Sequence, residues 1–549
     1  MFTIQNKPAS RTKHYPNDSL LAFLLTLPVF LFVLLYYLKS GNGLIAPGFL
    51  QYDNISYIAY ARQYPDSGFQ HLLYSNPFND SAQYPALYFQ VQNFLFLAFL
   101  YLGVPPGVTL IVFTLLFAFI TFRIIIALYD QLMPESKNRV LSILLFSWGG
   151  GLLVTAGLGA LSFIPIGGLD KIDRLFVLDP GWGWWGLNLG RSLLFSTEAY
   201  YHALFLGGIL SILKRKWVLA IFLSFLLFLS HPYTGIEYLS IIVAWCGYEI
   251  ILKKNRAIPA WFALANLMIL VLHIGYYMVW LNRFPDHHSV HEQCAMNLSM
   301  RYSTLIPAYI LTGCLAIGAL FTKGGIKPFL NKEYNRLFLT WFLISFLLAN
   351  HEIFMKPLEP VHFTRGYVWT SLFILGLPFL EQIWGYLRQK KKAALWISIL
   401  LFIFLSDNAA WLANYGRKGS STGLSVYLNK DQQAVLDWLK NNTDTSTLII
   451  SNDNLISILS TVYTKAYPWI SHNLATPFLS QKKDIYYHYI KNGVIDRAWG
   501  GRNFIFILNH EEGLENNRIQ HPGFIPDKTV RIGMFSLLIK RNLTRKESS

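Results

Sequence analysis

Long apolar runs separated by short polar segments make up the chain as far as about residue 413. The first run, 20–38, contains no charged residue and is long enough to cross the hydrocarbon core of a bilayer as a helix. Similar runs recur through this region, several of them short, and the pattern predicts about eleven transmembrane helices. The predicted spans are 20–38, 107–129, 139–160, 198–213, 217–231, 235–252, 258–281, 303–322, 335–350, 366–386 and 394–413.

A long polar and aromatic segment, 39–106, follows the first predicted span. It is too long for a simple connection between two helices, so we expect it to form a large first outer loop. Within it, Tyr88–Gly103 is apolar and rich in phenylalanine and tyrosine, residues that suit the membrane interface. We therefore predict that this stretch is a helix lying in the outer interface rather than a further span.

The pattern changes after residue 413, where the chain becomes more polar. Residues Asp431–Leu439 have the spacing of an amphipathic helix. Three short apolar runs are typical of buried strands: 447–450, 504–508 and 535–539. Strands that alternate with helices predict a small α/β domain at 414–549, which follows an all-α polytopic membrane domain at 1–413.

Composition and charge agree with a membrane protein. The chain of 549 residues is 53% hydrophobic and 14% charged, whereas soluble domains carry roughly 25% charged residues. Its net charge of +16 comes largely from short basic runs between the apolar spans. Those runs lie at 214–216, 253–254, 323–336 and 388–392. Basic residues in this arrangement indicate contact with anionic membrane lipids and argue against nucleic acid as a partner.

The positive-inside rule orients the predicted spans. It places the N-terminus and all four basic runs together in the cytoplasm, and an odd number of spans then leaves the C-terminal α/β domain outside. The sequence therefore predicts an integral, multi-pass protein of the inner or plasma membrane.

A carboxylate, Asp53, lies at the membrane edge shortly after the first predicted span. Tyr57 and Arg62 follow it closely, and a carboxylate between aromatic walls suits a base that deprotonates an acceptor. Asp53 could equally orient a nucleophile, hold a divalent cation or cap a helix. All these alternatives stay open at this point.

A second candidate region is the predicted outer loop from Phe163 to Thr197. It contains three aspartates, Asp170, Asp173 and Asp179, followed by Trp184 and Trp185. Sugars pack their CH-rich faces on indole rings while their hydroxyl groups meet carboxylates, so this composition favours sugar binding. Tryptophan is also abundant at membrane interfaces for purely physical reasons, which is the alternative for any single ring.

Ionisable residues near the predicted span ends form a third group. Glu198 and His202 are one helical turn apart and share a face. His231 ends another span on the same side, and ionisable groups in spans usually face a cavity. His362 and Arg365 open the tenth span from outside, at the depth where the phosphate of a lipid carrier would lie. Snorkelling of Arg365 to ordinary headgroups is the alternative.

Two histidines in the segment Asp286–Glu292, His288 and His291, offer metal-binding chemistry. Their spacing matches no established metal motif, so we predict a solvated polar loop and assign no metal ligand there.

The sequence resembles the GT-C superfamily of integral-membrane glycosyltransferases, and the likeness covers most of the chain. The resemblance is carried by Asp53 after the first span, Tyr84-Pro85-Ala86-Leu87-Tyr88, the end of the second span from Phe122-Arg123 to Tyr129, Leu229-Ser230-His231-Pro232, Arg365 at a late span, and a C-terminal outer domain.

The resemblance implies roles for individual residues. The first outer loop of the superfamily supplies a catalytic carboxylate, which falls on Asp53. A second acid comes from a later outer loop, where the options are Asp170, Asp173 and Asp179. Late-span arginines hold the carrier phosphate, which falls on Arg365. A divalent cation, Mg²⁺ or Mn²⁺, stays open as a cofactor.

The sequence also departs from the superfamily pattern in two places. Asn54 follows Asp53, so there is no acidic pair. Trp184-Trp185 is followed by Gly186 rather than an aspartate, which argues against peptide N-glycosylation.

The implied activity is transfer of a sugar from a polyprenyl-phosphate donor to a glycan, lipid or protein acceptor at the outer face. Tyr57, Arg62, Trp184, Trp185, Glu198, His202, His231, His362 and Arg365 are the expected substrate-binding residues. Two other classes of protein remain as alternatives: a transporter or flippase for lipid-linked sugars, and a non-catalytic protein of envelope assembly.

Overall fold

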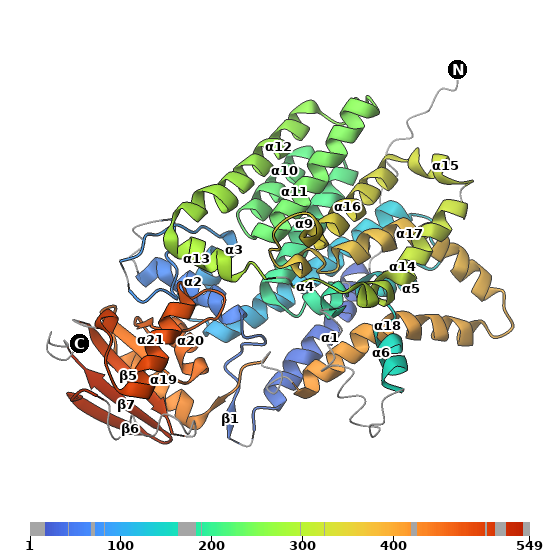
Figure 1. Ribbon diagram of the computed structural model, residues 1–549. Helices are drawn as coiled ribbons and strands as arrows, with labels where there is room; N and C mark the ends of the chain where they lie inside the picture. The colour runs from blue at the N-terminus through green and yellow to red at the C-terminus, as the bar shows by residue number, and fades with distance from the viewer. Residues whose placement is uncertain are drawn as a thin grey trace. The chain divides into compact units, whose positions relative to one another are not determined.

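The computed structural model describes the chain in several stretches (Figure 1), namely residues 17–41, 43–66, 72–81, 83–162, 183–187, 189–296, 298–322, 324–418, 425–499, 502–510 and 523–541. The chain divides into two compact units. Unit 1 comprises Met1–Phe32, Phe113–His273 and Asn297–Arg417, and unit 2 comprises Val33–Val112, Ile274–Met296 and Lys418–Ser549. The predicted boundary divides the chain once, at residue 413. The units of the structure are divided differently, because unit 2 joins Val33–Val112, from the predicted first outer loop, to the C-terminal region.

Helices make up the described part of unit 1. They are most of α1 (Asp18–Leu38) and α4 (Pro106–Leu132), followed by α5 (Arg139–Trp148), α6 (Leu153–Ser162), α8 (Leu189–Ser192), α9 (Ser196–Leu213), α10 (Trp217–Phe228), α11 (Pro232–Gly247), α12 (Ala260–Ile274), α14 (Tyr302–Thr322), α15 (Ile326–Leu330), α16 (Glu333–Ala349), α17 (Tyr367–Arg388) and α18 (Ala393–Lys418). Short helical turns η1 (Gly183–Gly186), η2 (Tyr248–Leu252), η5 (His351–Ile353) and η6 (Pro360–Phe363) connect or extend them.

Each predicted span coincides with one or two of these helices. Within the described residues, six helices are long and apolar enough to cross a bilayer, and the bent pair α5–α6 is a seventh candidate. The outward side chains of α12 include Trp261, Leu264, Met268 and Val271, all more than half exposed, as lipid-facing residues are. The chain is therefore a multi-pass membrane protein, while the number of about eleven crossings stays a prediction.

A break between α5 and α6 bends this pair by 60°. Side chains of α18 form hydrogen bonds with the backbone groups that the break leaves unpaired at both helix ends. The fully buried Asp407 accepts hydrogen bonds from the backbone N–H groups of Gly151 (2.9 Å), Leu153 (3.1 Å) and Val154 (2.9 Å). The next residue, Asn408, donates to the last carbonyls of α5 at 2.8 and 2.9 Å. Two adjacent side chains thus replace backbone bonds that the break removes.

We expect Asp407→Ala to destabilise the protein, because three buried N–H groups lose their acceptor. The loss should be about 2–4 kcal/mol in the free energy of unfolding, measured as a lower thermal midpoint in detergent. Ser406→Ala is the matched control, since it removes one hydroxyl bond within the same helix. Equal midpoints for the two variants would contradict this account.

Unit 2 contains a five-stranded mixed sheet in the order β4–β3–β5–β7–β6 (Figure 1). Parallel pairing joins β3 to β4 and β5, and antiparallel pairing joins β7 to β5 and β6. The three predicted strands are present as β3, β5 and β7. The strands are β3 (Thr447–Ser451), β4 (Tyr467–Pro468), β5 (Asn503–Asn509), β6 (Lys528–Ile532) and β7 (Phe535–Lys540).

The helices of unit 2 come from three separate parts of the chain. They are α2 (Asn54–Asp66), α3 (Val91–Tyr101), α13 (Pro285–Gln293), α19 (Lys430–Asn442), α20 (Asn454–Tyr463) and α21 (Leu479–Asn492), with the turns η3 (Gly275–Trp280), η4 (Leu281–Arg283) and η7 (Arg497–Trp499). Helix α19 is the predicted amphipathic helix, and α3 is the helix predicted within 88–103, whose interfacial position stays a prediction. The prediction of a polar loop at Asp286–Glu292 was wrong, because this segment forms helix α13 with Pro285 at its first turn. A two-stranded ribbon pairs β1 (Leu44–Ile45) with β2 (Leu428–Asn429).

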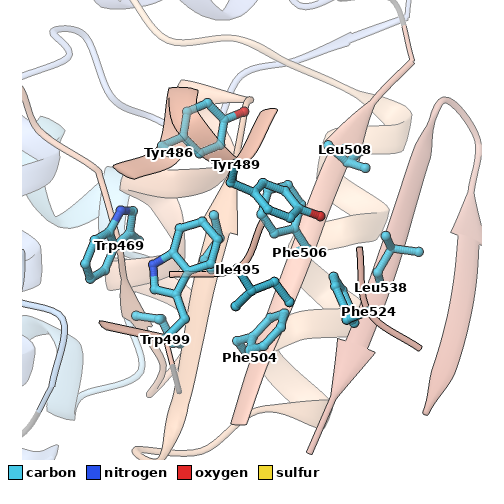
Figure 2. Close-up of a cluster of buried hydrophobic side chains, with 12 residues drawn as sticks. Trp469, Tyr486, Tyr489, Ile495, Trp499, Phe504, Phe506, Leu508, Phe524 and Leu538 are labelled. Atoms are coloured by element: carbon cyan, nitrogen blue, oxygen red, sulfur yellow. The ribbon is translucent and has the colours of Figure 1, made fainter. Parts of the chain in front are cut away.

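Alternation along β5 explains how the sheet is covered. Phe504 and Phe506 point to one face, where they pack with Tyr489 of α21 and Trp499 in a shared aromatic core (Figure 2). The intervening Ile505, on the opposite face, is also buried. Both faces are therefore covered, as expected for an α/β domain with parallel strands.

Lys482 of α21 is an unusual member of this packing. The side chain is buried, its Nζ lies 5.2 Å from the ring centroid of Trp469, and Nζ has no hydrogen-bond partner among the described residues. Burial lowers the pKa of Lys482 to about 8; the charge of Arg502 acts in the same direction and those of Asp80 and Asp286 oppose it.

This lowered pKa predicts a pH-dependent stability difference. Below about pH 8 the folded state must bury a charged amine, a cost that disappears as the pH rises toward 10.5, the ordinary value for lysine. Lys482→Met should therefore stabilise the protein at pH 7, with a smaller advantage at pH 9.5. Thermal midpoints of wild type and variant at both values measure this, and Lys483→Met is the neighbouring control. A difference independent of pH would contradict the assignment.

Candidate functional site

The predicted residues that the structure describes lie in both units. Asp53, Tyr57 and Arg62 lie in unit 2. A cluster around Glu198 and Arg365 lies in unit 1.

Asp53 occupies the turn directly before α2, and its side chain is 59% exposed. Its Oδ1 lies 3.1 Å from Nε2 of His472, and its Oδ2 accepts a hydrogen bond from Nε2 of Gln51 at 2.9 Å. Both of these partners are side chains, and neither is a backbone N–H group of α2. Helix capping therefore does not explain this carboxylate, which is held from two sides and still reachable by solvent.

His472 was not among the predicted residues. It is buried, and its ring lies between the stacked ring of Tyr52 (5.8 Å between centroids) and that of Phe78 (5.7 Å). It is 419 positions from Asp53 in the sequence. A single histidine after a short strand carries no signal that could have indicated this pairing.

Arg62 has contacts that indicate a structural role. Its guanidinium donates to carbonyl groups at the end of α20, those of Val462 and Thr464, the latter at 2.9 Å. Such carbonyls lack partners within their own helix, so Arg62 ties α2 to α20. Tyr57 meets Tyr60 edge to face with 6.1 Å between centroids. Substrate binding by Arg62 and Tyr57 stays a prediction.

Arg365 is the centre of the cluster in unit 1 and is buried directly before α17. Its Nη1 lies 3.5 Å from Oε1 of Glu198, and its Nη2 contacts Nδ1 of His362. Nε2 of His202 lies 2.9 Å from the carbonyl oxygen of Arg365, and Nδ1 lies 2.7 Å from that of Glu198. Four predicted residues from two separate segments are thus brought together.

Trp185, in η1, forms one wall of this cluster. The guanidinium of Arg191 lies 4.2 Å from its ring centroid, and that of Arg365 lies 5.6 Å away. The hydroxyl of Thr364 donates to the Trp185 carbonyl at 3.1 Å. Two guanidinium groups therefore share one indole, an arrangement stabilised by cation–π attraction.

Glu359 supplies the second carboxylate of the cluster. Its side chain is buried, and its backbone has a left-handed conformation with φ of 44°. Its Oε2 lies 3.0 Å from Nε2 of His362 and accepts a hydrogen bond from the hydroxyl of Tyr233 at 3.0 Å. Burial alone would raise the pKa of Glu359. Hydrogen bonds from His362 and Tyr233, with the charge of Arg365, instead hold it below its usual value.

Burial, reinforced by the charge of Arg365, lowers the pKa of His362, so its ring is neutral at neutral pH. The contact between Arg365 and Glu198 is long for an ion pair, and Oε2 of Glu198 has no hydrogen-bond partner among the described residues.

His231 has a local structural role. Its Nδ1 accepts from the backbone N–H of Thr234 at 3.1 Å and so caps the N-terminus of α11, with Pro232 as the first helical residue. Its ring stacks on Tyr201 at 4.4 Å between centroids. Binding of substrate by His231 stays a prediction.

Several predicted residues cannot be placed. Asp170, Asp173 and Asp179 lie outside the described residues, and so does the side chain of Trp184. The part of the chain that the structure describes contains no group of three or more histidine, cysteine, aspartate or glutamate side chains suited to a metal. A role for Mg²⁺ or Mn²⁺ therefore remains untested.

Sequence reasoning missed three residues of the unit 1 cluster: Arg191, Tyr233 and Glu359. Arg191 follows the predicted tryptophans, and Glu359 begins the segment that ends in Arg365. Proximity in sequence to predicted residues was the available signal for these two.

Comparison with known proteins defines the class. No protein-family model matches the sequence, and no curated protein matches it. Among solved structures, the arabinofuranosyltransferase AftD from Mycobacteria is 14% identical over 95% of this chain and 40% of that enzyme, with a TM-score of 0.51. The chain thus spans less than half of that enzyme's length.

Two other solved structures are more distant. The oligosaccharyltransferase AglB from Archaeoglobus fulgidus is 9% identical over 92% of this chain and 70% of its own, with a TM-score of 0.43. ArnT from Cupriavidus metallidurans is 10% identical over 96% of this chain and 99% of its own, with a TM-score of 0.48. The chain shares its fold with the arabinofuranosyltransferase AftD, which agrees with the sequence resemblance at the level of fold.

Proposed function

We propose that this protein is a glycosyltransferase that moves a sugar from a polyprenyl-phosphate donor to an acceptor at the outer face of the membrane. The observation that carries the proposal is the buried cluster of unit 1, in which Arg191 and Arg365 share the indole of Trp185. In the GT-C fold, such a cluster suits the phosphate of a lipid carrier.

Charge chemistry favours a phosphate ligand at Arg365. Its guanidinium is buried beside Glu198 and His362, so an anion that reaches it would meet a fixed positive charge in a site of low dielectric. Phosphate oxygens offer the fork geometry that guanidinium prefers. Arg365 also lies two residues before the start of α17, and the N-terminus of a helix attracts anions.

Asp53 fits the role of the base. Its carboxylate is exposed and held by two donors, so its remaining lone pairs can accept the proton of an acceptor hydroxyl. As the acceptor oxygen bonds to the anomeric carbon, the bond between that carbon and the phosphate oxygen breaks. Asp53 takes the hydroxyl proton, and the polyprenyl phosphate leaves with the negative charge.

The name of AftD makes an arabinofuranosyl donor the first to test. The acceptor is a glycan, a lipid or a protein, and the second acid is one of Asp170, Asp173 and Asp179. Localisation to the inner or plasma membrane, with a cytoplasmic N-terminus and an outer C-terminal domain, belongs to the same proposal.

Turnover of the purified protein in lipid nanodiscs tests the proposal. The assay supplies polyprenyl-phosphate arabinofuranose, then pentose and hexose analogues, with a mixed acceptor preparation, and measures released polyprenyl phosphate with Mg²⁺, Mn²⁺ or chelator. We expect Asp53→Asn to reduce release by about 100-fold or more, because a positioned base contributes 10²–10⁴ in rate. Arg365→Ala should weaken donor binding, and Arg365→Lys should restore little, because lysine lacks the fork.

Exposed residues provide matched controls: Asp484→Asn and Arg301→Ala should keep wild-type release. Full activity in Asp53→Asn would remove Asp53 from the mechanism. Unaltered donor binding without release from any donor would favour a transporter, a flippase or a non-catalytic assembly protein.

A further inference from the structure

We propose that His472, in the C-terminal α/β domain, is a positioning residue that orients the Asp53 carboxylate. This inference rests on the proposed function, because it assigns His472 a role in the same reaction. It means that the C-terminal domain contributes a side chain to the catalytic centre.

The tautomer of His472 follows from its hydrogen bonds. Its Nδ1 accepts from the backbone N–H of Leu474 at 3.1 Å, so the proton of the neutral ring lies on Nε2. That nitrogen is 3.1 Å from Oδ1 of Asp53 and donates to it. Nδ1 therefore bonds to the backbone of the loop that carries His472, and Nε2 bonds to the carboxylate of Asp53.

The segment that carries His472, residues 469–478, is itself anchored. From the first outer loop, Nδ2 of Asn76 donates to the carbonyl of Ala475 at 2.8 Å. From α13, Gln293 donates to the carbonyl of Thr476 at 3.1 Å, and Ser289 accepts from the N–H of Phe478 at 2.8 Å. These three bonds fix the backbone from which the imidazole reaches Asp53.

Orientation matters because Asp53 is the more exposed partner. A carboxylate that is 59% exposed would sample several rotamers in water. Bonds from Gln51 to Oδ2 and from His472 to Oδ1 set the plane of the carboxylate and leave the other lone pairs open to an acceptor hydroxyl. A base is effective only within hydrogen-bond reach of its proton, so fixing this plane acts on the rate of the chemical step.

Two near-isosteric substitutions separate the two sides of the ring. His472→Asn places an amide near Nδ1, so it can still accept from Leu474 but cannot reach Asp53. His472→Gln places an amide N–H near Nε2, so it can still donate to Asp53 but gives up the Leu474 bond. Both variants are measured in the release assay with the same polyprenyl-phosphate sugar that wild type uses.

We expect His472→Asn to lower kcat by about 10–100-fold with little change in KM for the donor. His472→Gln should stay within a few-fold of wild type. In an Asp53→Asn background, His472→Asn should cause no further loss, since a residue that acts through Asp53 has nothing left to orient. A lower thermal midpoint alone would not produce this pattern.

Three outcomes would overturn the inference: wild-type kcat in His472→Asn, equal losses in the Asn and Gln variants, or an additive loss in the double variant. If Asp53→Asn alone abolishes release while His472→Asn does not change it, the proposed function stands and only this inference fails. If Asp53→Asn keeps full activity, the proposed base itself is wrong.

Discussion

Burial of a permanently charged guanidinium is the constraint on which the chemistry of unit 1 depends. Arg365 cannot give up its proton, and removing it from water costs several kcal/mol unless anions or hydrogen-bond acceptors surround it. Glu198 and His362 contact this guanidinium, and the face of Trp185 lies 5.6 Å from it. Under the proposed function, the phosphate of the lipid carrier binds at the same guanidinium.

The same rule governs a helix break elsewhere in unit 1. A helix end in an apolar surrounding needs a partner for every free N–H and carbonyl group. Asp407 and Asn408 provide these partners where α5 breaks from α6. Buried polar residues in this protein therefore have two distinct uses, and only their partners distinguish them. The partners of Asp407 and Asn408 are backbone groups of the same unit, whereas the guanidinium of Arg365 lies 3.5 Å from the carboxylate of Glu198.

Local pattern was sufficient to predict most elements and part of the site. Hydrophobic periodicity located the helices and three of the strands, because these patterns reflect burial of a single face or segment. It also marked Glu198, His202, His362 and Arg365, since charges near apolar spans are rare. The pairing of Asp53 with His472 could not be predicted, because it depends on how a distant loop packs. Arg62 and His231 show that a polar residue predicted to bind substrate can instead form hydrogen bonds with the backbone at a helix end.

Direct observation of the carrier would test the central claim most sharply. A cryo-EM structure of the protein in nanodiscs with a polyprenyl phosphate added would locate the phosphate. The account predicts phosphate oxygens within hydrogen-bond distance of Arg365, with the contact to Glu198 lengthened or lost. A phosphate bound instead at the basic segments 214–216 or 388–392, with the Arg365 cluster unchanged, would contradict it.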